Sequence, residues 1–141
     1  MTATNTWRVD IWTDGSCNPN PGPAGWAAIL ISGDYRKELM GHLPDSTNIR
    51  AEITAAIEAL RTLKSRSVRV AIHTDSAYVK LALEGMERPR TNLDLLAELA
   101  AVTVGHVVTV EWVRGHTGDP NNERADALAK QARTMLETEM P

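Results

Sequence analysis

The sequence lacks the marks of a secreted or membrane protein. No apolar run in its 141 residues approaches the roughly 20 residues that a membrane-spanning helix needs. The first residues carry neither a basic patch nor the apolar core of a signal peptide. The single cysteine, Cys17, cannot form an internal disulfide, which agrees with a reducing compartment. These absences predict a cytoplasmic protein that has no contact with a membrane.

An excess of positive charge is absent too. The 15 Lys and Arg residues against 18 Asp and Glu residues give a formal net charge of −3 at pH 7. Binding to phosphates through counterion release needs clustered basic side chains. Taken alone, the charge therefore argues against a general nucleic-acid binder.

What the sequence does have is the composition of one globular domain, with 43% hydrophobic and 23% charged residues. We predict a single domain over residues 1–141, with an ordered core over about 6–136. The sequence makes no prediction for the structure of the tail 137–141. Phenylalanine is absent, and the aromatic residues expected in the core and strands are four tryptophans: Trp7, Trp12, Trp26 and Trp112.

Alternating and continuous apolar segments in the first third of the chain predict an antiparallel meander. A strand with alternating burial begins near Val9 and has Asp14 at or near its carboxyl end. Residues 18–23 hold three prolines and form a loop. Residues 25–32 and 35–43 then form the second and third strands.

Apolar spacing and capping residues predict the rest of the α/β fold. The expected elements are helix 48–64, strand 68–74, helix 76–84, helix 93–103, strand 107–113 and helix 119–136. Five strands and four helices in this order indicate a mixed sheet flanked by helices. Asp14 and Asp75 would meet beyond the strand ends if their strands are neighbours.

Four acidic residues stand at the ends or flanks of apolar segments: Asp14, Glu52, Asp75 and Asp126. A lone carboxylate in such a place is costly unless a cation or hydrogen bonds compensate its charge. Together, the four predict a divalent-metal site.

Each acid also has a simpler explanation. Asp14 with Gly15 is a common turn pair, and Asp75 stands where it would cap the helix that follows. Glu52 and Asp126 suit exposed helix positions. Taken one at a time, these structural explanations are better than catalysis, so the whole pattern has to decide.

Six motifs follow one another through nearly the full chain. They are TDGSC at 13–17, NPGPAG at 20–25, TNIRAE at 47–52, TDSAYV at 74–79, WVRGHTG at 112–118 and NERAD at 122–126. Any one of them is weak, but in this order and spacing they resemble ribonuclease H of type 1. The resemblance implies a ribonuclease H-like fold and an endonuclease that cuts the RNA strand of RNA–DNA hybrids, leaving 5′-phosphate and 3′-hydroxyl ends.

The resemblance also implies a role for each acidic residue. Two Mg²⁺ ions, which Mn²⁺ can replace, would be bridged by Asp14 and held by Asp75 and Asp126. Glu52 would complete the shell and contact the substrate ribose. His116, in a glycine-flanked loop, would relay a proton as the product leaves. Because the bound cations cancel the charge of the acids, the argument from net charge is weakened.

Contacts to the hybrid are implied for seven residues: Gly15, Ser16, Cys17, Asn20, Thr47, Asn48 and Arg114. The backbone amides of the first three, and the side chains of Asn20 and Asn48, are candidates to read the 2′-hydroxyl that separates RNA from DNA. Thr47 and Arg114 are candidates to hold phosphates. No residue is indicated for reading base edges, so we expect cleavage that tolerates sequence.

Three features depart from the best-known bacterial pattern. Ile49 stands where an asparagine often follows Asn48, and Ala77 stands where a glutamine is common. The link 84–92 is too short for a long basic protrusion and keeps only Arg88 and Arg90. We therefore expect weak, salt-sensitive binding to the hybrid, unless another surface or a partner supplies positive charge. A monomer is the simplest expectation for the oligomeric state.

Two other functions remain open from the sequence. A DNA nuclease of the wider superfamily would use the same scaffold and clustered acids, although the loop 115–118 favours ribonuclease H. A hybrid-binding module without activity would keep the scaffold alone, although the presence of all four acids speaks against it.

Overall fold

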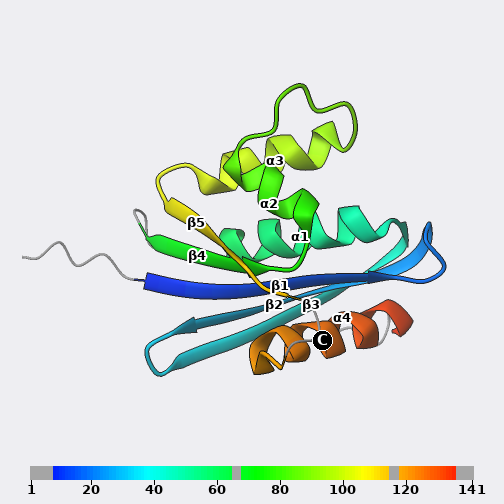
Figure 1. Cartoon of the computed structure of the whole chain (residues 1–141). Coiled ribbons are helices and arrows are strands. Elements are labelled where there is room, and N and C mark those ends of the chain that lie inside the picture. The colour runs from blue at the N-terminus through cyan, green and yellow to red at the C-terminus, as the bar shows by residue number, and fades with distance from the viewer. Residues whose placement is uncertain (1–7, 65–67, 115–117, 136–141) are drawn as a thin grey trace, which may run out of the picture.

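The computed structural model describes residues 8–64, 68–114 and 118–135. The elements in chain order are β1 (Arg8–Cys17), β2 (Gly22–Ser32), β3 (Tyr35–Ser46), α1 (Asn48–Arg61), β4 (Arg69–Thr74), α2 (Ala77–Glu84), α3 (Leu93–Thr103), β5 (Val107–Trp112) and α4 (Pro120–Thr134) (Figure 1). The predicted order of strands and helices is confirmed. Trp7 and the tail 137–141 lie outside the described residues.

The five strands form one mixed sheet in the order β3-β2-β1-β4-β5. The antiparallel pairs β1–β2 and β2–β3 are the predicted meander. The pairs β1–β4 and β4–β5 are parallel. Because β1 and β4 are neighbours with Trp12 opposite His73, the residues that follow these two positions lie side by side.

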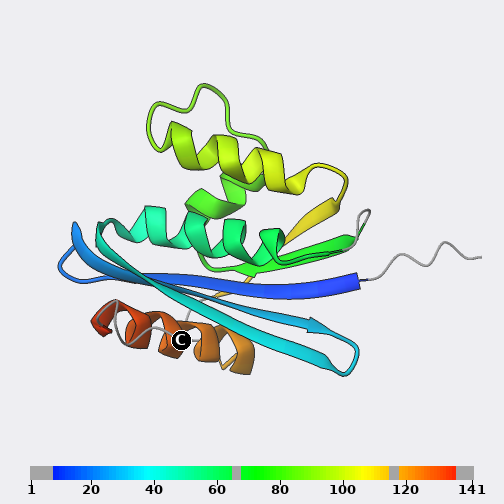
Figure 2. The ribbon, with the colours of Figure 1, turned by 180° about the vertical axis from the view of Figure 1, so that it is seen from behind.

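Helices cover both faces of the sheet. Figures 1 and 2 show α1, α2 and α3 on one face and α4 on the other. The main core lies under α1, where Ile11, Ile53, Ile57 and Ile72 are at most 1% exposed. On the other face, α4 contacts β1, β2 and β3. Gly25 permits this contact, because a side chain there would overlap the backbone of α4 at Ala129.

Strand β1 is longer than predicted. It continues past Asp14 to Cys17, because this stretch pairs with Ala24–Ala27 of β2. Asp14 and Gly15 are therefore strand residues, and the turn explanation for this pair is wrong. The extended pairing also moves the start of β2 forward to Gly22 and the end of β3 to Ser46.

Two details of the second half also differ from prediction. α1 ends at Arg61, where Thr62 closes its last turn by donating its backbone N–H to the carbonyl of Glu58. Trp112 is a strand residue, as predicted, at the end of β5, but it is 50% exposed and so lies outside the core. β5 is an edge strand, and an edge strand leaves such side chains partly uncovered.

Within the part of the chain that the structure describes, no helix combines the length and the apolar character needed to cross a membrane.

Candidate metal centre

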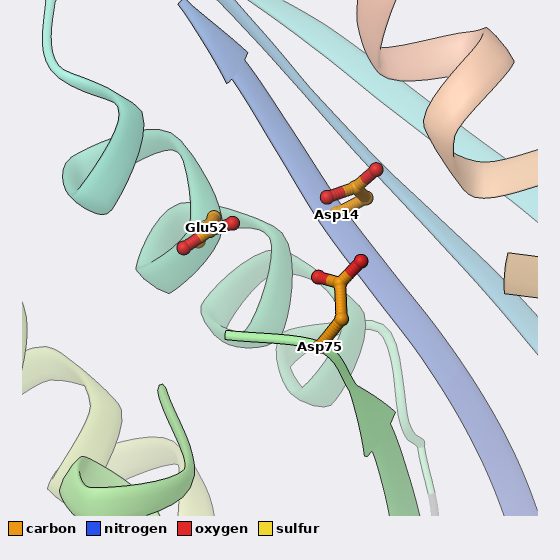
Figure 3. A group of neighbouring side chains, drawn as sticks. All are labelled: Asp14, Glu52 and Asp75. Carbon is orange, nitrogen blue, oxygen red and sulfur yellow. The ribbon is translucent and has the colours of Figure 1, made fainter. Parts of the chain in front are cut away.

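Three of the four predicted acids converge on one point. Asp14 comes from β1, Glu52 from α1 and Asp75 from the residue after β4. Each offers a carboxylate oxygen, and these oxygens all lie within 4.8 Å of one another (Figure 3). Asp14 and Asp75, about 60 positions apart in the sequence, meet because β1 and β4 are neighbours, as predicted, although Asp14 lies within β1 and not beyond its end.

The sheet and a glycine place the cluster. Trp12 of β1 pairs with His73 of β4. Asp14 stands two residues after Trp12, and Asp75 stands two residues after His73. The two acids therefore lie on the same face of neighbouring strands. Gly15 lets β1 lie directly against α1, since a side-chain carbon there would be 2.6 Å from the backbone nitrogen of Glu52.

The helix-cap explanation for Asp75 is wrong. The N-cap of α2 is Ser76, whose hydroxyl accepts a hydrogen bond from the backbone N–H of Val79 at 3.2 Å. The backbone N–H of Ser76 in turn donates to the hydroxyl of Thr74 at 3.0 Å. The carboxylate of Asp75 points instead toward Asp14 (Figure 3).

Burial and mutual repulsion raise the free energy of the ionised carboxylates in this cluster. Burial raises the pKa of Asp14 to about 8, and the charge of Asp75 and a hydrogen bond with Asp126 act in the same direction. The backbone N–H of Gly15 opposes the shift by donating to the Asp14 carboxylate at 2.9 Å. Burial likewise raises the pKa of Glu52 to about 7, against a hydrogen bond from Ser76.

Asp126 lies beside the cluster and outside the group of three. It sits on α4, its side chain is 29% exposed, and it forms an ion pair with Lys130 at 3.0 Å. Its hydrogen bond and its charge both raise the pKa of Asp14, so the two carboxylates are in contact. The fourth predicted acid is therefore at the site but is balanced by a lysine.

The donor set fits a divalent cation. Carboxylate oxygens are the hard ligands that Mg²⁺ and Mn²⁺ prefer. The raised pKa values of Asp14 and Glu52 show that the protein alone does not compensate these charges, and a bound cation would do so.

The predicted substrate residues border the cluster. Gly15, Ser16 and Cys17 follow Asp14 directly in β1. Ser16 is buried, and its hydroxyl accepts a hydrogen bond from the guanidinium of Arg133 at 2.7 Å. The thiol of Cys17 is half-buried and donates to the backbone carbonyls of Pro19 and Gly22, at 3.3 and 3.5 Å.

The structure also brings Asn20, Thr47 and Asn48 together. The side-chain carbonyl of Asn20 accepts from the backbone N–H of Asn48 at 3.1 Å. The hydroxyl of Thr47 caps α1 by accepting from the backbone N–H of Arg50 at 3.1 Å. The bond from Asn48 to Asn20 ties the loop 18–21 to the start of α1, the helix that carries Glu52.

The last two predicted residues follow β5. Arg114 is exposed, one residue after Val113, whose backbone N–H donates to the carbonyl of Thr74 at 2.9 Å. That bond holds the end of β5 next to Asp75. His116 lies outside the described residues, so its role stays a prediction.

Sequence reasoning missed three residues at the edge of this site. Lys130 could have been found, because it stands four positions after Asp126 on a helix, where opposite charges pair. Arg133 and Trp12 have no such signal, because Ser16 and Asp119, their partners, are more than 100 positions away in the sequence.

Comparisons with known proteins agree with this geometry. A sequence model of the RNase H family matches residues 6–134. A ribonuclease H of Gluconobacter oxydans is 44% identical to this chain, with 92% of the chain and 94% of the relative covered. A ribonuclease H of Granulibacter bethesdensis is 46% identical, with 89% and 91% covered.

Solved structures give the same result. The N-terminal RNase H domain of a Mycobacterium tuberculosis protein has a TM-score of 0.80 and 27% identity, covering 91% of this chain and 94% of that domain chain. RNase H1 from the archaeon Halobacterium salinarum has a TM-score of 0.74 and 31% identity, with 89% and 96% covered. The predicted five-stranded fold is confirmed.

Proposed function

We propose that this chain, which belongs to the RNase H family, hydrolyses the RNA strand of RNA–DNA hybrids as a metal-dependent endonuclease. The observation that carries the proposal is the cluster of Asp14, Glu52 and Asp75, which has the donor atoms and the charge for a divalent cation. The family supplies the reaction, and the cluster supplies the groups that the reaction needs.

The acidic residues divide the work of metal binding. Asp14, the most buried of the four acids, would share two Mg²⁺ ions with Asp75 and Asp126. Such a pair of cations would activate water and neutralise charge on the attacking and leaving oxygens of a phosphodiester. Glu52 would add a further carboxylate ligand and contact the substrate ribose. Mn²⁺, with the same preference for oxygen ligands, can replace Mg²⁺.

The residues around the cluster would hold the hybrid. We assign Gly15, Ser16 and Cys17 to the minor groove side of the RNA strand, where the 2′-hydroxyl distinguishes RNA from DNA. Asn20 and Asn48, which the structure places together, would contact the same strand. Thr47 and Arg114 would hold phosphates, and His116 would move a proton during product release.

Affinity for the hybrid should be low. The link between α2 and α3 offers only Arg88 and Arg90, both exposed, as extra positive charge. With a formal net charge of −3, the protein depends on bound cations and on these few side chains to attract phosphates. A monomeric state and a cytoplasmic location stay predictions of the sequence.

A panel of labelled substrates tests the proposal. RNA–DNA hybrid, single-stranded RNA, duplex RNA, duplex DNA and branched DNA are incubated with the protein in Mg²⁺ and in Mn²⁺, and the ends of the products are determined. Cleavage of only the RNA strand of the hybrid, with 5′-phosphate ends, is expected. Cleavage of DNA would assign the chain to the nuclease relatives, and binding to the hybrid without any cleavage would make it a binding module.

A further inference from the structure

A connected row of side chains lies next to the cluster on the same face of the sheet. The Nε2 atom of His73 and the Oδ1 atom of Asp10 are 2.9 Å apart. The imidazole of His73 stacks on the indole of Trp12, with ring centroids 4.2 Å apart and planes inclined by 8°. The indole N–H then donates to the Oδ2 atom of Asp119 at 3.3 Å. The row joins β4 and β1 to the residue that starts α4.

Asp119 uses its two carboxylate oxygens for different purposes. Oδ1 caps α4 by accepting from the backbone N–H groups of Asn121 and Asn122, at 2.9 and 3.0 Å. Oδ2 accepts from Trp12. The cap that begins the helix is therefore also the point at which the helix is attached to the indole.

We propose that Trp12 is a positioning residue, which through Asp119 sets the direction of α4 and so holds Asp126 beside Asp14. This inference rests on the proposed function, in which Asp126 serves the metal centre. Asp126 lies about 10 Å along the helix from its cap, at about 1.5 Å per residue. A tilt of about 5° at the cap would therefore move its carboxylate by about 1 Å, a displacement large enough to disturb a catalytic site.

The stack explains why an indole suits this role. The ring of Trp12 is held between the sheet and the cap by His73, and His73 is held in turn by Asp10. The indole N–H therefore has a fixed direction when it meets Asp119. A phenylalanine at this position keeps an aromatic ring beside His73, but it loses the hydrogen bond to Asp119 and part of the indole's packing surface.

A second attachment of the same helix provides a matched control. From β3, Glu38 accepts two hydrogen bonds from the guanidinium of Arg124, both at 3.0 Å. Arg36 donates to the side chain of Asn121 at 3.0 Å. These contacts attach the first turns of α4 to the edge strand β3, whereas Trp12 attaches the cap of the same helix to the central strand β1.

The test compares Trp12→Phe with Glu38→Gln in two measurements. One is the affinity for Mg²⁺ in the absence of substrate, followed by NMR titration, and the other is the kcat and KM for hybrid cleavage. Trp12→Phe should weaken Mg²⁺ binding two- to fivefold or lower kcat three- to tenfold at an unchanged KM. Glu38→Gln should leave both within about twofold of wild type while it lowers the temperature of unfolding.

A double variant with Trp12→Phe and Asp119→Asn adds a further requirement. The two residues act through one hydrogen bond. The double variant should therefore lose no more Mg²⁺ affinity or kcat than the more impaired of the two single variants. The inference is overturned if Trp12→Phe matches wild type in both measurements, if Glu38→Gln shows equal losses, or if the two single effects add in full. Failure of the wild-type protein to cleave hybrid would instead refute the proposed function, and the Mg²⁺ titration would still test the positioning role.

Discussion

Replacing Asp14 by asparagine should stabilise the metal-free protein while it removes the metal site. The ordinary pKa of this carboxyl is 3.8, and burial beside Asp75 and Asp126 raises it to about 8 in the folded protein. At pH 7 the folded protein therefore binds a proton that the unfolded chain does not. Asparagine has the same shape, can accept from the N–H of Gly15 and can donate to Asp126, and it carries no charge.

The magnitude follows from the pKa shift. Solution at pH 7 lies about three units above the ordinary pKa, and each unit is worth about 1.4 kcal/mol, which sets a ceiling of about 4 kcal/mol. We expect Asp14→Asn to raise the free energy of unfolding by about 1–4 kcal/mol in metal-free buffer. Because a raised carboxyl pKa destabilises the folded state only above the unfolded pKa, the gain should vanish below about pH 4 and grow up to about pH 8.

Urea unfolding of both proteins from pH 4 to pH 8, with and without Mg²⁺, measures this effect. Mg²⁺ should stabilise the wild type by mass action and should stabilise the variant much less. Asp34→Asn, in the exposed turn between β2 and β3, is the control and should change stability by less than about 0.5 kcal/mol. The reasoning is refuted if Asp14→Asn destabilises the metal-free protein at pH 7, or if its effect does not depend on pH.

Three further predictions concern other parts of the molecule. Gly25→Ala should destabilise the protein by at least about 2 kcal/mol in thermal unfolding, because the added carbon overlaps the backbone of α4; stability equal to wild type would contradict the packing. The hydrogen bond from Arg124 lowers the pKa of Glu38 from 4.5 to about 2, so Glu38→Gln should cost up to about 1 kcal/mol at pH 7. That cost should fall as pH drops from about 4.5 to about 2, and a cost that is constant with pH would count against the ion pair. Hybrid binding, measured by fluorescence anisotropy, should weaken steeply as salt rises, and nanomolar binding insensitive to salt would show that another surface supplies positive charge.

Local patterns in the sequence predicted most of the elements and the acids. Apolar spacing and capping residues identified α1 and α3, because both signals depend on neighbours within a few residues. The acids stood out because each lies at the end or on the flank of an apolar segment. Asp75 could be placed near Asp14 only by assuming that β4 lies beside β1. Glu52 could be placed there only by assuming that α1 packs against β1.

Features that depend on distant pairing were beyond the sequence. The extension of β1 to Cys17 requires knowledge that β2 pairs with it residue by residue. The exposure of Trp112 follows from the position of β5 at the edge of the sheet. The bond from Trp12 to Asp119 joins residues 107 positions apart, and no local signal marks either partner.

The most direct test of the metal centre is single-turnover cleavage of a labelled RNA–DNA hybrid by wild type and by Asp75→Asn, titrated with Mg²⁺. Asp75 is the sharpest choice, because Ser76 and not Asp75 caps α2, so the substitution removes a carboxylate and leaves the cap in place. The account predicts Mg²⁺-dependent cutting of the RNA strand by wild type and a loss of at least about a hundredfold in the folded variant. Cutting by Asp75→Asn at the wild-type rate, with the same Mg²⁺ dependence, would contradict it.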